Sequence, residues 1–444
     1  MAFSVRLERF TSRPVLFVSA LRRRLEMTLI RTSVMAGATA VIRMAIGLGI
    51  TKIIAVYVGP AGMALFGQFQ SFMSAAGAIA SGGTSNGVVK YLAQHRDAPD
   101  QRRRVFCTAV ILGLSLSGVV AAVLVSDAAA IALVLFGQEG YEPAIFAIAA
   151  GLVFMSTNAT LIAALNGLKL SARFFCVQIV LGLLSLILVV AFVPTYGIIG
   201  AMIALVVSQP LCLIVALFLL PSTLRVSASN ILRLADKASA VQLIRFSAMA
   251  LTTAIVVPAS HIAIRDTLAS NVSIQAAGYW HGMWRISEVY LLFITSALSV
   301  YYLPRLSEID DKTLLLHEII GAAKYVIPAA IFSSAIIFLS RDLIIYMLFT
   351  SEFRDMRELF AYQMIGDVLK VSSWLLAFLM LAKARAALYI TSEIVFAALF
   401  VGLTIILVKS YGLVGSSMAH AANYAIYLML MLLYARYELG SGNR

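Results

Sequence analysis

Long apolar runs recur from one end of this chain to the other, and they limit its possible folds more than any other feature. A helix needs about 20 mostly apolar residues to cross the hydrocarbon core of a bilayer. A transmembrane barrel is excluded, because its strands alternate apolar and polar residues in segments of about 10. The runs predict an all-α polytopic membrane protein with twelve transmembrane helices at 33–58, 64–93, 105–126, 144–167, 172–193, 197–220, 241–265, 276–304, 314–338, 356–382, 386–409 and 413–436.

Composition agrees with a membrane protein and argues against other classes. The chain is 61% hydrophobic and 12% charged, and a soluble protein of this size could not bury so much apolar surface. Its net charge of +13 is better explained by cytoplasmic loops than by a nucleic-acid partner. Cys107, Cys176 and Cys212 show no CxxC spacing, so we expect neither a disulfide framework nor a metal site.

The charge of the loops predicts how the chain is oriented. Short loops rich in Lys and Arg stay cytoplasmic. Basic residues gather in the loops after the even-numbered predicted helices, at 96–104, 169–173, 225–237, 305–312 and 383–385. The opposite loops of the first half contain almost none, and 341–357 is a partial exception with balanced charges. Both termini are therefore expected in the cytoplasm.

An internal repeat predicts two related bundles. Tyr196-Gly197-Ile198-Ile199-Gly200 recurs as Tyr411-Gly412-Leu413-Val414-Gly415, Leu135–Glu139 as Leu348–Glu352, and Ala61-Gly62 as Ala277-Gly278. All three matches share an offset of 213 to 216 residues. Because each half holds six predicted helices, the halves have parallel topology, and a transported substrate is expected between them.

These observations divide the chain into five parts. Residues 1–32 are expected to form a basic cytoplasmic tail, although translation from Met27 is an alternative. A pseudo-symmetric six-helix bundle at 33–220 is followed by a cytoplasmic amphipathic linker at 221–240. A second six-helix bundle spans 241–437 around a shared central lumen, and 438–444 is a C-terminal tail.

The predicted span from Gly278 to Pro304 carries a polar stripe. His281, Arg285 and Glu288 are spaced i, i+4 and i+7, so they fall on one face of a helix. A charge in hydrocarbon costs at least about 2.5–3.5 kcal/mol, so such residues usually face a bundle interior or a wet cavity. Arg285 and Glu288 are therefore expected to line a passage, whereas His281 could also be a packing residue.

Other predicted spans also contain charges. Arg43 lies too deep to reach the surface easily. Asp367 and Lys370 share a helix face, where they either line the lumen or pair with each other; if they pair, Asp367→Asn alone should harm folding and the double neutral variant should fold better. Several charges also allow an ordinary structural explanation: Lys52 and Lys90 as helix-end residues, Arg265 paired with Asp266, and Glu393 paired with a cation on a neighbouring helix.

Together these charges indicate an anion-handling secondary transporter. Arg binds phosphate through a planar fork of donors and Lys acts as a point charge, so a passage with Arg43, Arg285, Lys370 and Lys52 suits an anionic substrate. The acids could hold these cations in place or carry a coupling proton or sodium ion, and no other cofactor is expected. The sequence shows no nucleotide motif and no large catalytic loop, which argues against an enzyme.

Four stretches resemble a known family. VGPAGMALFGQFQ at 58–70, SNGVVKYLAQ at 85–94, FITSALSVYYLPRLS at 293–307 and FRDMRELFAYQMIGDVLKV at 353–371 are similar to the Wzx-type O-antigen and enterobacterial common antigen flippases. These belong to the multidrug/oligosaccharidyl-lipid/polysaccharide exporter superfamily. The similarity covers Met27 to the C-terminus and leaves out residues 1–26, which favours Met27 as the start.

The resemblance implies a function in the bacterial inner membrane. It implies transfer of undecaprenyl-diphosphate-linked oligosaccharide repeat units from the cytoplasmic to the periplasmic leaflet by alternating access, with a polysaccharide polymerase and a chain-length regulator as partners beside membrane lipids. The residues it proposes for diphosphate or lumen contact are Arg43, Lys52, Lys90, Arg265, Arg285 and Lys370, with Glu288, Asp367 and Glu393 for coupling or charge balance and His281 and Lys383 secondary. Arg43 and Glu288 stand where the family has Lys and Asp, which keeps the charge and changes the shape. A cation-coupled small-molecule antiporter of the same superfamily is the alternative.

Overall fold

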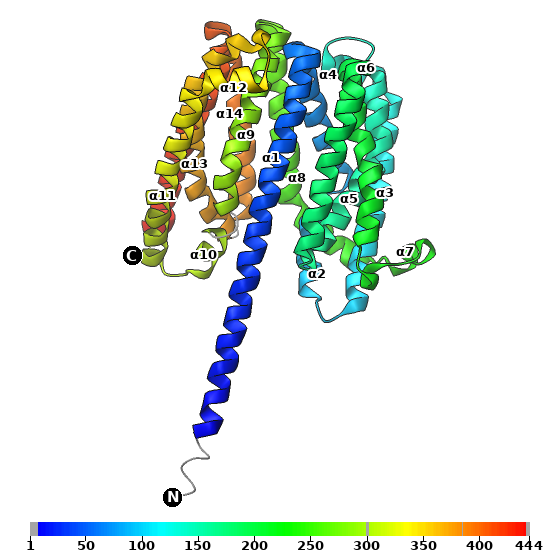
Figure 1. Ribbon diagram of the computed structural model, residues 1–444, viewed down its shortest axis with the longest axis vertical. Coiled ribbons are helices and arrows are strands. Elements are labelled where there is room, and N and C mark those ends of the chain that lie inside the picture. Colours follow the sequence, from blue (N-terminus) through cyan, green and yellow to red (C-terminus); the bar gives the residue numbers. More distant parts are fainter. Residues whose placement is uncertain (1–7, 299–301, 384, 441–444) are drawn as a thin grey trace, which may run out of the picture.

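The computed structural model of the chain describes residues 8–298, 302–383 and 385–440, and every regular element in these ranges is helical (Figure 1). The α-helices are α1 (Glu8–Ala80), α2 (Ser85–Gln94), α3 (Pro99–Ser126), α4 (Ala128–Phe136), α5 (Glu142–Gly167), α6 (Ser171–Leu219), α7 (Ala228–Leu234), α8 (Lys237–Asn271), α9 (Ile274–Ala297), α10 (Leu303–Glu308), α11 (Lys312–Leu339), α12 (Arg341–Leu348), α13 (Phe360–Ala382), α14 (Ala386–Tyr411) and α15 (Val414–Gly440). Two 3₁₀ segments, η1 (Ser222–Leu224) and η3 (Ser351–Leu359), complete the described elements.

Within these ranges, eight helices are long and apolar enough to cross a membrane: all or part of α1, α3, α5, α6, α11, η3 with α13, α14 and α15. The qualifying parts of α1 and α6 are 47 and 49 residues long, about twice the length of one crossing. α8 and α9 are not among the eight, and they carry several of the polar residues singled out in the sequence. The count of twelve crossings stays a prediction.

α1 turns back on itself at Gly59, whose φ of 69° and ψ of −168° leave the helical region. Residues on both sides of this turn touch the same part of α9. A Cβ atom on Gly47 would lie 3.2 Å from a guanidinium nitrogen of Arg285, and one on Gly67 would meet the ring of His281. Twenty residues of straight helix would separate Gly47 from Gly67 by about 30 Å, whereas His281 and Arg285 are about one turn apart. α1 is therefore a helical hairpin that contains the first predicted span and the first part of the second.

α6 is a second hairpin, and its turn confirms the internal repeat. The hydroxyls of Ser185 and Ser208 lie 3.0 Å apart on its two arms. The turn residue Gly197 has φ 56° and ψ −136°, and Gly412, between α14 and α15, has φ 59° and ψ −138°. Gly200 and Gly415 each lie against the preceding arm, since a Cβ atom there would collide with a carbonyl oxygen, of Phe192 and Leu407 respectively.

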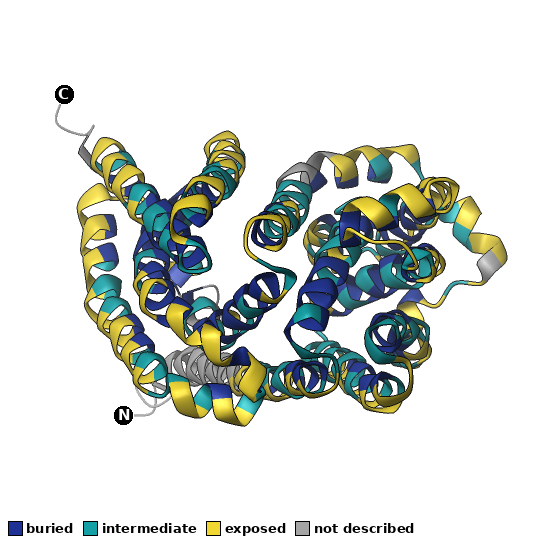
Figure 2. Cartoon of the chain, turned by 90° about the horizontal axis from the view of Figure 1, so that it is seen from above, coloured by how far each residue is buried: buried dark blue, intermediate teal, exposed yellow. Residues whose placement is uncertain are grey.

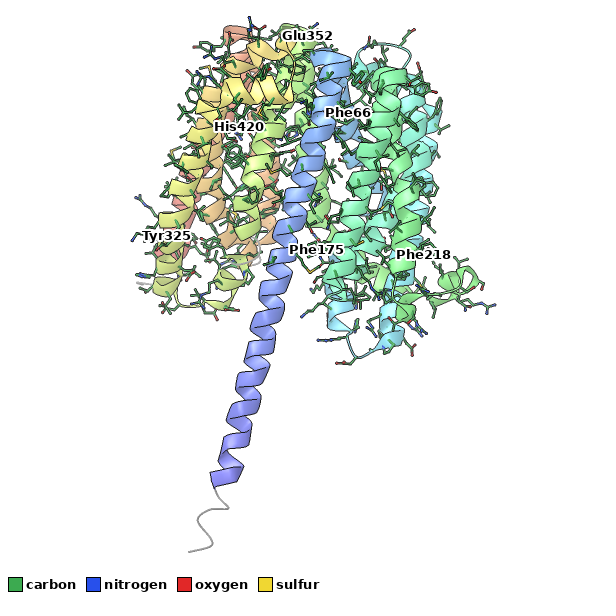
Figure 3. All side chains as sticks on the ribbon, viewed as in Figure 1. Phe66, Phe175, Phe218, Tyr325, Glu352 and His420 are labelled. Carbon is green, nitrogen blue, oxygen red and sulfur yellow. The ribbon has the colours of Figure 1, made fainter. Side chains whose placement is uncertain are left out.

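The helices pack as two lobes. In the first lobe α6 packs on α1 and α5, and α3 packs on α5; in the second, α15 packs on α13 and α14, and α8 and α11 join them. The lobes meet where α1 contacts α8 and α9, and seen from above they lie side by side (Figure 2). Phe218 and Tyr325 point outward from the two lobes, as lipid-facing side chains do (Figure 3).

The two ends of the molecule differ, and we name them by their connections. The turn end carries the turns at Gly59, Gly197 and Gly412, and the linker end carries the connection between α6 and α8 (Figure 1). This connection contains η1 and α7, and the Asp236 carboxylate caps α8 by accepting a hydrogen bond of 2.8 Å from the Ser239 amide. Residues 8–32 of the predicted tail continue α1 beyond the bundle, whereas 1–7 and 441–444 lie outside the described residues.

Some segments differ from the sequence-based expectation. The predicted span 64–93 unwinds at 81–84, where Gly82 and Gly83 have φ near +60°, so the small polar run there breaks the helix. The loops expected at 127–143 and 339–355 contain the short helices α4 and α12. The predicted span 276–304 ends as α9 at Ala297, and residues 299–301 lie outside the described part of the chain.

Candidate functional site

A fully buried arginine joins the lobes at the turn end. Arg265 of α8 donates from Nε to Oε1 of Gln68 at 3.0 Å and from an Nη atom to Oγ of Ser71 at 2.6 Å, and both partners belong to the second arm of α1. Its guanidinium also lies 5.8 Å from a ring of Trp280. The hydrogen bonds of Arg265 go to α1 and not to Asp266, whose side chain is exposed. The interpretation of Arg265 and Asp266 as an interfacial ion pair is therefore wrong.

The contact between α1 and α9 is so close at two points that only glycine fits. A Cβ atom on Gly278 would collide with the backbone of Pro60, and the buried ring of His281 packs on Gly67. Glu352 also approaches Gly59, and its carbonyl accepts a hydrogen bond of 2.8 Å from the Tyr279 hydroxyl. The lobes are therefore closed at the turn end (Glu352 is labelled there in Figure 3).

Further from the turn, each lobe contributes one arginine near the contact between α1 and α9. Arg43 of α1 donates a hydrogen bond to Oε1 of Gln178 on α6. Arg285 of α9 forms an ion pair of 2.7 Å with Glu288. The Arg285 guanidinium reaches α1 at Gly47, which is one helical turn after Arg43, so the two positive charges lie near each other. The site thus holds two cations and one carboxylate, an arrangement that an anion would stabilise.

Beyond Arg285, α9 leaves the first lobe. Gly278, His281 and Arg285, which contact α1, all lie in the first half of α9. The Glu288 side chain, one turn later, is 44% exposed and also accepts a hydrogen bond of 3.0 Å from Trp284 Nε1. The sequence-predicted stripe of His281, Arg285 and Glu288 therefore runs from the closed contact to partly exposed side chains. The exposed region beside Arg285 and Glu288 is called the cleft below.

Asp367 lies in a fully buried hydrogen-bond network in the second lobe. Its Oδ2 accepts hydrogen bonds from Ser287 (2.6 Å) and Tyr290 (2.7 Å), and its Oδ1 lies 3.0 Å from Nε2 of His420. No ion pair between Asp367 and Lys370 occurs within the described ranges, so the structure does not bear out the expected pairing of these two residues. The network instead ties α13 to α9 and α15.

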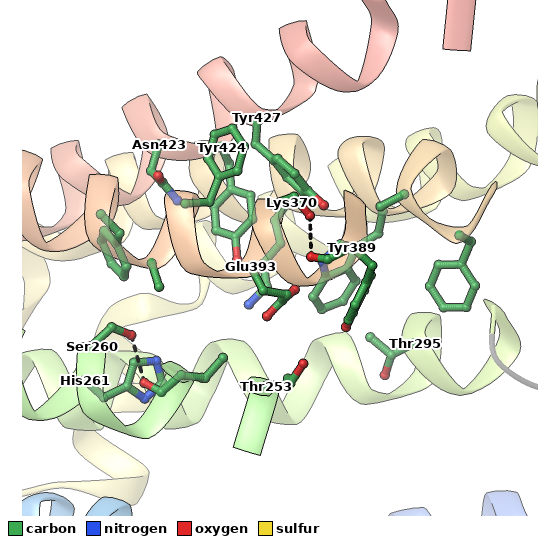
Figure 4. A pocket seen from close by; sticks show the side chains of 18 of the residues that line it. Thr253, Ser260, His261, Thr295, Lys370, Tyr389, Glu393, Asn423, Tyr424 and Tyr427 are labelled. Atoms are coloured by element: carbon green, nitrogen blue, oxygen red, sulfur yellow. Dashed lines mark hydrogen bonds between the residues drawn. The ribbon is translucent and has the colours of Figure 1, made fainter. Parts of the chain in front are cut away.

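Lys370 instead faces aromatic rings at the edge of a cavity of about 380 Å³ inside the second lobe (Figure 4). Its Nζ lies 4.7 Å from a ring centroid of Trp284, 5.0 Å from Trp374 and 5.5 Å from Tyr424. Such contacts stabilise a desolvated ammonium. Glu393 of α14 lines the same cavity, but no ion pair between Glu393 and Lys370 occurs among the described residues, so its pairing with a neighbouring cation stays a prediction.

Three predicted residues lie elsewhere. Lys52 is exposed on α1, seven positions before the turn at Gly59, and Lys90 is exposed on α2. Lys383 follows α13 at the linker end, where its Nζ donates to the carbonyl of Ile309 at 2.6 Å and pairs with Asp310 at 3.2 Å. The structure therefore does not place these three lysines in one group with Arg43 and Arg285.

Sequence reasoning missed the aromatic part of the site. Trp284, Trp374, Tyr389, Tyr424 and Tyr427 come from four helices and meet at the cavity. Aromatic residues in an apolar span usually pack in a core, so none of them stands out alone. Trp284 was detectable in principle, because it precedes Glu288 by four residues, a spacing at which helical side chains touch.

Comparisons with known proteins agree with this architecture. The model of a family described as polysaccharide biosynthesis protein matches residues 64–358. Lipid III flippases from Escherichia coli (strain K12) and Shigella flexneri are each 34% identical to this chain over 413 residues, which covers 91% of this chain and 97% of each relative.

Solved structures share the fold at lower identity. The inward-facing conformation of a multidrug resistance MATE family transporter of the MOP superfamily gives a TM-score of 0.79 at 14% identity, covering 90% of this chain and 98% of that one. The outward-facing conformation of such a transporter gives 0.68 at 16% identity, covering 93% and 96%. The predicted all-helical, two-lobed membrane fold is confirmed.

Proposed function

Because the chain belongs to the polysaccharide biosynthesis protein family, we propose that it is a flippase that moves lipid-linked oligosaccharides across the membrane for surface polysaccharide biosynthesis. One observation carries this proposal: the 34% identity to lipid III flippases extends over 97% of their length. The substrate in this proposal is an oligosaccharide linked to undecaprenyl diphosphate. The protein moves this lipid across the membrane without changing it chemically.

The diphosphate would bind between the lobes at Arg43 and Arg285. These guanidiniums come from different lobes, and Arg285 reaches α1 one helical turn after Arg43, so two like charges lie near each other. A diphosphate would accept hydrogen bonds from both forks and remove the repulsion. Glu288 would hold the Arg285 guanidinium through their ion pair of 2.7 Å until the substrate arrives. Lys52 is the next cation along α1 toward the turn end.

Alternating access would follow from the closed turn end. The basic loops lie at the linker end, which supports a cytoplasmic position for this end. Substrate would enter the cleft there, next to Glu288 and Arg285, and leave after the contacts of Arg265 and Gly278 open. A polymerase and a chain-length regulator would use the product, and a proton or sodium gradient would drive the cycle.

A liposome experiment tests the function. Purified protein is reconstituted with a fluorescent undecaprenyl-diphosphate sugar, a proton or sodium gradient is imposed, and an impermeant quencher reports how much lipid has crossed. We expect crossing to require the protein. We expect Arg285→Ala to reduce the rate at least about tenfold, since it removes a charged hydrogen bond to the substrate.

Arg305→Ala is the matched control. Arg305 also pairs with glutamates, Glu308 at 3.8 Å and Glu318 at 3.6 Å, but it lies at the linker end away from the cleft. Its loss should leave the rate nearly unchanged. Normal transport by a well-inserted Arg285→Ala variant would remove Arg285 from the proposed site. A correctly folded wild type that moves no lipid would overturn the flippase and favour a small-molecule antiporter.

A further inference from the structure

The cavity inside the second lobe has walls of two kinds. α9, α13, α14 and α15 supply aromatic rings, and α8 closes the other side with mostly small and polar side chains (Figure 4). The aromatic residues that line it are Trp284, Trp374, Phe378, Tyr389, Phe396, Phe400, Tyr424 and Tyr427. A concave, mostly aromatic space with few polar groups is typical of a site for a small organic group.

One polar side chain in this wall has an unused acceptor. Asn423 lines the cavity and is only 4% exposed, and its Oδ1 finds no hydrogen-bond partner among the described residues. Leaving a buried acceptor without a partner costs about 1–3 kcal/mol, so such atoms usually face a ligand or water. The free Asn423 carbonyl therefore indicates a ligand that carries a hydrogen-bond donor, such as a hydroxyl or an amide N–H.

The charges in the cavity narrow the ligand class. Lys370 contributes a cation held over ring faces and Glu393 contributes a carboxylate, so donors and acceptors are both present with little net charge. An organic cation would be repelled by the Lys370 ammonium, which lies within 5.5 Å of three of the ring centroids. An inorganic anion would meet Glu393 and a largely apolar wall. A sugar ring has an apolar face for the aromatic rings and hydroxyls for both kinds of polar group.

A continuous chain of contacts joins this cavity to the proposed diphosphate site. Arg285 binds Glu288 at 2.7 Å, Glu288 accepts from Trp284 Nε1 at 3.0 Å, and the same indole lies 4.7 Å from Lys370 Nζ. Trp284 thus stands between the cleft and the cavity. In a lipid-linked oligosaccharide the first sugar is bonded directly to the diphosphate, so two adjacent sites of these kinds match its covalent order.

We propose that the cavity is a saccharide subsite, which takes the sugar nearest the diphosphate. This inference rests on the proposed function. Trp374 and Tyr424 would stack on the ring, Asn423 would accept a hydrogen bond from it, and Lys370 and Glu393 would orient its polar substituents. The subsite gives the carrier a means to distinguish glycosylated lipid from bare lipid diphosphate, because a site left with unpaired polar groups rejects the smaller ligand.

Binding measurements on the purified, full-length protein test the subsite. The probes are undecaprenyl diphosphate and undecaprenyl-diphosphate-linked N-acetylglucosamine, and affinities are measured by calorimetric titration. We expect the wild type to prefer the glycosylated lipid by about fivefold to tenfold, the effect of one buried hydrogen bond. Asn423→Leu should abolish this preference and leave the affinity for bare undecaprenyl diphosphate unchanged.

Three further variants complete the design. Trp374→Leu removes a stacking surface and should also reduce the preference, so the test does not depend on the folding of one variant. Asn271→Leu is the matched control, because this asparagine lies at the exposed end of α8 and hydrogen-bonds only within its own turn. It should behave as wild type. Arg285→Gln should weaken the binding of both lipids equally.

The outcomes separate the subsite from the function. Full preference for the glycosylated lipid in both Asn423→Leu and Trp374→Leu overturns the subsite, and so does a wild type that binds both lipids equally. A wild type that binds neither lipid overturns the proposed function first. If Trp374→Leu instead loses affinity for tetraphenylphosphonium while its sugar preference is intact, the cavity is an organic-cation site and the proposal is wrong.

Discussion

At the scale of single residues, the buried acid Asp367 owes its position to partners on its own helix and on two others. Ser287, Tyr290, Gln363 and His420 surround its carboxylate, and Gly366 leaves room for the His420 ring, because a Cβ atom there would collide with it. A buried carboxylate held by several donors is stable only while the set is complete. Asp367 therefore works as the centre of a network that spans α9, α13 and α15.

A double-mutant cycle tests this network. Asp367→Asn should lower the thermal stability of the purified protein, because it weakens hydrogen bonds worth about 1.5–3 kcal/mol each to a charged group. Adding His420→Leu should show a large coupling, whereas adding Lys370→Met should show a smaller one. If the Asp367→Asn/Lys370→Met double variant is more stable than Asp367→Asn alone, the network interpretation is wrong and the Asp367–Lys370 ion pair expected from the sequence is favoured.

This residue also shows how far sequence reasoning reaches. Charges in apolar spans identified Arg285, Glu288, Asp367 and Lys370 as inward-facing, because hydrocarbon does not solvate them. The partners on other helices could not be identified this way, since Ser287 and His420 become neighbours of Asp367 only through packing. Gln363, four residues earlier on α13, was detectable from its spacing. The spacing of i and i+3 suggested Lys370 as the partner of Asp367. The Lys370 ammonium instead lies over aromatic rings from α9, α13 and α15.

At the scale of elements, the two glycine turns explain why the hairpins form where they do. Gly197 and Gly412 have φ near +57° and ψ near −137°, a backbone conformation that side chains strongly disfavour. Both turns are open to the surroundings, with no atom within 4 Å of the place that a Cβ atom would take, so a substitution would meet backbone strain alone. The sequence repeat around these glycines therefore records a repeated backbone geometry.

Alanine substitution measures this strain. Gly197→Ala and Gly412→Ala should each destabilise the protein by about 1–3 kcal/mol, with similar losses because the two turns share one geometry. Thermal denaturation in detergent detects the change. Gly402→Ala in the middle of α14 is the control, because the position is helical and also has open space around it. Equal stability of all three variants would contradict the argument.

Glycine also decides how closely α9 approaches α1. Gly278→Ala would place a methyl group on the Pro60 backbone, so the turn end should no longer close. We expect transport to fall while insertion stays normal, and we expect an impermeant maleimide to label Met63→Cys, which is buried beside this contact in the wild type. Gly321→Ala on α11, where space is open, should leave both readouts unchanged.

At the scale of the whole molecule, orientation follows from the distribution of basic loops. In a background that lacks the three native cysteines, an impermeant maleimide added to intact cells should label Glu139→Cys, near the turn end. It should label Ala98→Cys, near the linker end, only after the membrane is permeabilised. Labelling in the reverse order would place the linker end outside the cell and reverse the proposed direction of entry.

The whole-molecule fold was easier to foresee than the geometry between its lobes. Twelve apolar runs, a repeat near 214 residues and the loop charges predicted two helical lobes with a polar passage. The contact between lobes depends on close approaches such as Gly278 to Pro60, which no local pattern signals. The internal cavity depends on side chains from five helices, and their convergence is a property of the fold alone.

The buried Arg265 has a consequence for timing. Its two hydrogen bonds to neutral partners across the lobes are worth about 3–6 kcal/mol together, which favours the shut turn end by about 10²–10⁴. When this end opens, the Arg265 guanidinium loses its hydrogen bonds to Gln68 and Ser71, and water must replace them as the lobes separate. The slow step of a transport cycle is then expected to be the hydration of one arginine, and its rate should depend on how readily water enters, whatever glycan the carrier holds.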